Sequence, residues 1–72
     1  MQLEREVTMA QRLKCSRDAR GLSLEDAAKA AGISRSAVWN YENGWNLPVP
    51  GVIVTLAKVY GVSSDYLLRG RS

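Results

Sequence analysis

The chain has 72 residues, with ten basic against seven acidic side chains, no histidine and one cysteine. This length allows one domain with a small core, and such a domain often gains stability by dimerising. Because the chain lacks histidine and a second cysteine, the sequence excludes a structural zinc site, a disulfide framework and histidine-dependent catalysis. Cys15 is interpreted as a reduced thiol, with a redox sensor as the alternative. A net charge of +3 favours an anionic partner only mildly.

The sequence shows no segment typical of a membrane span or a secretory signal. The longest uncharged apolar run, residues 49–57, contains Pro50 and Gly51 and is too short to cross a bilayer. Charges alternate at residues 4–6, where a signal peptide would build an apolar segment. We therefore expect no membrane partner.

Hydrophobic spacing, serine caps and glycine stops predict an all-α fold, a compact bundle of five helices in one domain spanning residues 1–72. No stretch of the sequence has the alternating pattern of a strand. We expect residues 1–5 and 70–72 to be frayed. The expected helices occupy residues 5–20, 24–31, 35–43 and 50–60, with a short fifth helix that contains residues 66–68.

The most informative segment is residues 23–44, where two short helical patterns are joined by a three-residue turn. Ser23 caps the first of these helices, and Asp26 stands where it would complete a capping box. Gly32 ends that helix where the backbone must turn sharply, and Ser34 caps the next one. Such a turn holds two helices at a steep crossing angle, so that the second enters a DNA major groove.

The outward face of the helix at 35–43 carries side chains that can read bases. Arginine and asparagine form paired hydrogen bonds with guanine and adenine edges, and serine serves either base. The alternative is that any exposed helix face is polar, but the neighbouring turn favours base reading. Trp39 either contacts a sugar or thymine methyl, or folds against Trp45 and Leu47 over the core. Trp45 either packs on the domain or contacts the DNA backbone. The candidate base-reading residues are Arg35, Ser36, Trp39 and Asn40.

Several short motifs follow one another along the chain in a characteristic order. They are Arg17 with Gly21-Leu22-Ser23, Ala28, Gly32-Ile33-Ser34, Val38, Tyr41-Glu42-Asn43-Gly44, Pro50, Leu56-Ala57 and Gly61-Val62-Ser63-Ser64-Asp65-Tyr66-Leu67-Leu68. In combination they resemble the phage repressor and Cro type of helix-turn-helix domain, the XRE-like or lambda-repressor-like family. The resemblance covers about residues 9–69 and implies a five-helix domain that binds double-stranded DNA sequence-specifically.

The resemblance also implies individual roles. Arg17 and Glu42 would form an ion pair that links the first and third helices. Many relatives begin the second helix with a glutamine that contacts the DNA backbone, and Leu24 stands there instead. The expected phosphate contacts, partly by resemblance and partly by their place beside the backbone path, are Ser23, Ser34, Asn43, Arg17, Lys14 and Asn46.

The leading hypothesis is a cytoplasmic transcriptional regulator of a bacterium or phage, a repressor that binds a palindromic operator as a homodimer and is nucleoid-associated when bound. Prophage repressor, antitoxin and restriction-modification controller are compatible roles. The alternative is a protein-interaction module of the same fold, an antitoxin or polymerase-factor partner with weak DNA binding. An enzyme is least favoured because the sequence offers no nucleophile–base set, carboxylate pair or glycine-rich phosphate loop. We expect no cofactor and no metal.

Overall fold

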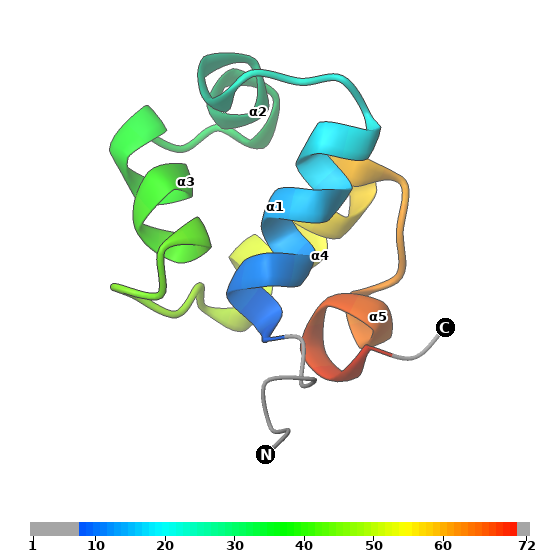
Figure 1. The fold of residues 1–72 in the computed structure, drawn as a ribbon. Coiled ribbons are helices and arrows are strands. Elements are labelled where there is room, and N and C mark those ends of the chain that lie inside the picture. The colour runs from blue at the N-terminus through cyan, green and yellow to red at the C-terminus, as the bar shows by residue number, and fades with distance from the viewer. Residues whose placement is uncertain (1–7, 71–72) are drawn as a thin grey trace.

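A computed structural model describes residues 8–70, which form five α-helices and no strand around one small core (Figure 1). The helices are α1 (Met9–Ala19), α2 (Leu24–Ala31), α3 (Arg35–Glu42), α4 (Pro50–Tyr60) and α5 (Ser64–Arg69). The expected all-α, five-helix fold is confirmed. Of the expected frayed ends, residues 1–5, 71 and 72 lie outside the described residues. None of these helices combines the length and apolar character needed to cross a membrane.

The start of α1 differs from the expected one, because the helix begins at Met9 and not near residue 5. Thr8 has an extended backbone, and its hydroxyl accepts a hydrogen bond from the Gln11 N–H at 3.2 Å. The Gln11 side chain accepts one in return from the Thr8 N–H at 2.9 Å, which completes a capping box. At α2 the expected box is half formed. The Ser23 hydroxyl accepts from the Asp26 N–H at 3.0 Å, but no return bond forms within residues 8–70.

The turn between α2 and α3 has the geometry that the sequence predicts. Gly32 adopts the left-handed conformation, with φ 72° and ψ 30°, and the Ile33 N–H donates back to the Ala28 carbonyl at 3.0 Å. A Cβ atom at Gly32 would meet nothing within 4 Å, so the positive φ alone calls for glycine. The Ser34 hydroxyl then accepts from the Ala37 N–H at 3.0 Å and begins α3.

The core lies where α1, α2, α4 and α5 meet. Its buried residues are Leu13, Ala27, Ile53, Leu56, Ala57, Tyr60 and Leu67. Leu68 is 47% exposed, because it follows Leu67 by one position and therefore faces another direction on the short α5. Arg12 ties α5 to α1, since its Nε donates to the Leu67 carbonyl at 2.9 Å and its Nη2 to the Leu68 carbonyl at 3.0 Å.

A buried ion pair joins α1 to α3. Arg17 Nε lies 2.6 Å from Glu42 Oε2, and Arg17 Nη2 donates to Glu42 Oε1 at 2.9 Å, so the contact is bidentate. The two side chains are 10% and 4% exposed. A third donor, Arg17 Nη1, reaches the Leu22 carbonyl at 2.8 Å. The hydrogen bond to Glu42 raises the pKa of Arg17, against the opposing effect of burial.

We expect Glu42→Ala to lower the free energy of unfolding by about 3 kcal/mol, because the substitution leaves the Arg17 cation buried without its partner. Urea unfolding measures this loss. The matched control is Asp18→Ala, which removes an exposed carboxylate 3.5 Å from Arg17 Nη1 and should cost less than about 1 kcal/mol. Equal losses for the two variants would contradict a structural role for the Arg17–Glu42 pair.

Tyr60 gives the stability an alkaline pH dependence. Burial of its phenol, and then the nearby charge of Glu42, raise the pKa of Tyr60 from 10.0 to about 12. The folded state therefore holds this proton more tightly, so the stabilisation is full below pH 10 and is lost as the pH rises through 12. Between those values we expect wild-type unfolding free energy to fall by about 2 kcal/mol more than that of Tyr60→Phe. Urea unfolding in pH steps tests this, and parallel curves would refute it.

Candidate nucleic-acid interface

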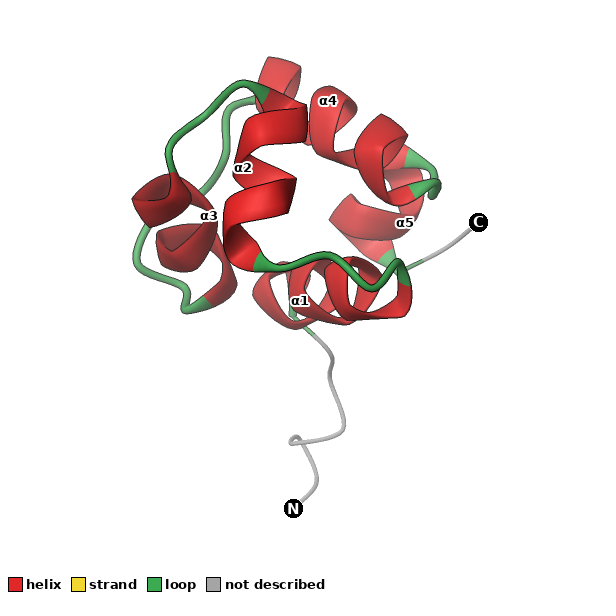
Figure 2. Ribbon diagram, turned by 90° about the horizontal axis from the view of Figure 1, so that it is seen from above, coloured by secondary structure: helices red, strands yellow, loops and turns green. Residues whose placement is uncertain are grey.

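Helix α3 stands at one side of the domain and α5 at the other, as both views show (Figure 1, Figure 2). It packs on α2 and α1. Val38 is buried and Tyr41 is half-buried on the inner side of α3. The opposite side is turned away from the core, because a helix advances about 100° per residue. The sequence therefore presents a continuous outer face on α3.

The candidate base-reading residues lie on this outer face with their polar groups unused. Arg35 and Ser36 are exposed, and Asn40 is half-buried. Within residues 8–70 no carboxylate pairs with Arg35, and neither the Ser36 hydroxyl nor the Asn40 side-chain amide forms a hydrogen bond. These donors and acceptors are available to an external partner.

Trp45 and Leu47 do not cover the core from the loop side. Trp45 is 72% exposed and Leu47 is 78% exposed, so, of the two alternatives for Trp45, packing is wrong, and contact with the DNA backbone stays a prediction. The Trp45 N–H donates to the Asn40 carbonyl at 2.9 Å, and the buried residue of this loop is Pro48. Trp39, at 44% exposed, remains part of the outer face of α3.

The N-termini of α2 and α3 differ in charge. The hydroxyls of Ser23 and Ser34 both cap a helix as acceptors, and each keeps its own O–H to donate to a phosphate. The first turn of α2 carries Glu25 and Asp26, whereas that of α3 has no acidic residue. An anion is therefore better accommodated at the start of α3. Leu24, at the first position of α2, offers only its backbone N–H.

The other expected phosphate contacts lie in unlike surroundings. The donors of Arg17 are engaged inside the domain by Glu42 and by a backbone carbonyl. Lys14 is exposed and lies 3.4 Å from an Asp18 oxygen. Asn43 uses one N–H of its amide on the carbonyl of Trp39 at 2.9 Å, which leaves the other N–H. The exposed Asn46 side chain forms no hydrogen bond within residues 8–70.

Comparison with known proteins finds relatives across most of this chain. It is 32% identical over 62 residues to the HTH-type transcriptional regulator ImmR of Bacillus subtilis (strain 168), covering 86% of this chain and 49% of that protein. The chain spans about half the length of the curated relatives it matches.

Solved structures share the fold. The P22 c2 repressor, in complex with the synthetic operator 9T and in the presence of Tl+, matches with a TM-score of 0.88 and 26% identity, over 92% of this chain and 100% of that one. The complex of SinR with SinI matches with a TM-score of 0.81 and 28% identity, over 86% of this chain and 61% of that one. A family model described as a helix-turn-helix domain matches residues 8–69. The chain therefore belongs to the helix-turn-helix domain family.

Proposed function

We propose that this domain is the sequence-specific DNA-binding module of a transcriptional regulator, which occupies a palindromic operator by placing α3 in the major groove. The observation that carries the proposal is the outer face of α3. There Arg35, Ser36 and Asn40 keep their polar groups unused, beside a helix N-terminus without acidic residues. Arginine and asparagine in such positions discriminate guanine and adenine by bidentate hydrogen bonds.

The relatives support a repressor in the bacterial cytoplasm. One similar structure is described as a repressor in complex with a synthetic operator, and one similar protein is named a transcriptional regulator. A repressor of this kind acts by occupancy. A homodimer would set two copies of α3 about 34 Å apart, one turn of DNA, and would match a palindromic site.

The candidate phosphate contacts suggest how affinity and discrimination are divided. Ser34, Asn43 and Asn46 are neutral donors, and the charge of Lys14 is partly offset by Asp18. Few counterions are released when neutral groups bind phosphates, so little non-specific affinity comes from charge. Discrimination by the α3 face then makes up a large share of operator binding.

We expect Arg35→Ala to weaken binding to the preferred operator by about 1–3 kcal/mol and to relax the preference at one base position. The operator is first obtained by selecting DNA from a random pool, and affinities are measured by fluorescence anisotropy. The matched control is Arg69→Ala, which removes the same charge from an exposed site on α5. If Arg35→Ala weakens operator and random DNA equally, base reading by Arg35 is refuted.

A second candidate function, a protein-interaction module, is favoured by the loop after α3. Trp45, Leu47 and Val49 are exposed large apolar side chains within one short segment. Exposed apolar clusters often mark contact surfaces for proteins, and one similar structure contains SinR together with the SinI protein. On this reading, selection from a random DNA pool would enrich no motif.

Selection from a random DNA pool, run on wild type and on Trp45→Ser, separates the two functions. Because the side chain is 72% exposed, we expect the free energy of unfolding to stay within about 0.5 kcal/mol of wild type. Leu56→Ala, in the core, is the control and should cost about 2–5 kcal/mol. For a DNA-reading module the folded Trp45 variant still enriches the wild-type motif. Failure of both proteins to enrich any motif would favour the interaction module.

A further inference from the structure

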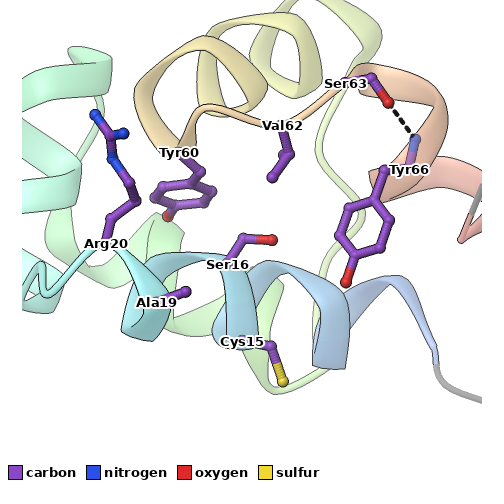
Figure 3. Close-up of a pocket in the computed structure, with 8 residues that line it drawn as sticks. All are labelled: Cys15, Ser16, Ala19, Arg20, Tyr60, Val62, Ser63 and Tyr66. Carbon is purple, nitrogen blue, oxygen red and sulfur yellow. Dashed lines mark hydrogen bonds between the residues drawn. The ribbon is translucent and has the colours of Figure 1, made fainter. Parts of the chain in front are cut away.

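A cavity of about 570 Å³ opens between the second half of α1 and the junction of α4 with α5 (Figure 3). Ser16 lines it from α1 and Arg20 from the C-cap of that helix, four residues further on, so both lie on the same side. Tyr60, Val62 and Tyr66 line it from the other side. Its size falls within the usual range for small-molecule sites, which are mostly apolar with a few convergent polar groups.

Ser16 is the first sign that this cavity takes a polar ligand. The residue is 6% exposed, and within residues 8–70 its hydroxyl forms no hydrogen bond. Figure 3 shows the hydroxyl directed into the space between Tyr60 and Tyr66. Thr55, also within a helix, satisfies its hydroxyl by donating to the Gly51 carbonyl at 3.0 Å. Buried hydroxyls without a partner are rare, so the Ser16 hydroxyl calls for one.

Arg20 supplies a cation at the same cavity. Its side chain is exposed, and no carboxylate of residues 8–70 pairs with it. A Cβ atom built at Gly61 would lie 3.1 Å from Arg20 Nη1, so the guanidinium rests against the end of α4. The Ser63 hydroxyl accepts a hydrogen bond from the Tyr66 N–H at 2.9 Å (Figure 3) and keeps its own O–H to donate. The described lining therefore offers hydroxyl groups, with that of buried Ser16 first among them, and one cation.

We propose that this cavity binds a small aromatic carboxylate. Its ring packs among Tyr60, Val62 and Tyr66, because aromatic and branched walls favour a flat apolar body. Its carboxylate accepts a hydrogen bond from the buried Ser16 hydroxyl. The exposed Arg20 side chain, whose guanidinium lies beyond the Tyr60 ring in Figure 3, swings toward the carboxylate to form the ion pair. The site lies on α1, α4 and the start of α5, separate from the outer face of α3, so it stands independently of the proposed DNA reading.

The test uses benzoate as the probe and benzyl alcohol as its neutral match, titrated into the full 72-residue chain. Amide chemical shifts in heteronuclear NMR report the site and the dissociation constant. We expect saturable shifts at Ser16, Val62 and Tyr66 with benzoate, and binding of benzyl alcohol weaker by about tenfold or more, since a hydrogen bond to a charged group is the stronger kind. Saturation also raises the unfolding temperature, because the probe binds only the folded state.

Two variants identify the groups that hold the carboxylate. Ser16→Ala removes a buried hydroxyl that has no partner in the described chain, so it should fold normally and bind benzoate about tenfold more weakly. Arg20→Gln, at an exposed position, should show a similar loss. Ser64→Ala, a serine outside the cavity lining, is the matched control and should bind like wild type. The proposal is overturned if benzoate gives no saturable shift, if benzyl alcohol binds equally, or if both variants bind like wild type.

Discussion

The buried pair between Arg17 and Glu42 fixes the position of the helix on which the proposed function depends. Helix α3 buries one residue fully, Val38, so apolar packing alone holds it weakly. The bidentate contact sets its rotation about its own axis, and the bond from Arg17 to the Leu22 carbonyl holds the entry into α2 at the same time. One buried cation therefore orients α2 and α3 against α1. Its value is geometric, because an apolar pair of equal volume can be as stable but has no preferred direction.

Local signals in the sequence predict most helix boundaries, but they do not predict contacts between residues far apart in the chain. Ser34 and Gly32 act within four residues of themselves, so their caps follow from the neighbouring sequence. The sequence predicts too early a start for α1, because the apolar spacing extends on the N-terminal side of Thr8. The reciprocal bonds between Thr8 and Gln11 instead make Met9 the first residue of the helix. Arg12 reaches carbonyls 55 and 56 residues away, and no local pattern announces such a contact.

Side-chain burial was predictable where helix periodicity decides it and not where a loop decides it. The outer face of α3 follows from its 3.6-residue period, so Arg35 and Ser36 were placed on the exposed side. The loop after α3 has no helical period, so its burial can be predicted only from residue type, which favours a buried tryptophan and an exposed proline. Trp45 stands in solvent while Pro48 is buried. Ser16 is the reverse case, a small polar residue that the crossing of α1 with the α4–α5 junction buries.

The proposed cavity and the proposed reading face meet at Tyr60. Its ring lines the cavity, and its hydroxyl lies within electrostatic range of both Arg17 and Glu42, the pair that orients α3. A ligand in the cavity would therefore contact Tyr60, which lies within electrostatic range of this pair, without touching α3. Coupling is reciprocal, so a ligand that strengthens operator binding is itself bound more tightly on the operator by the same factor. It arises only if the free and DNA-bound domains differ in the setting of Tyr60, since a ligand with equal affinity for two arrangements shifts neither.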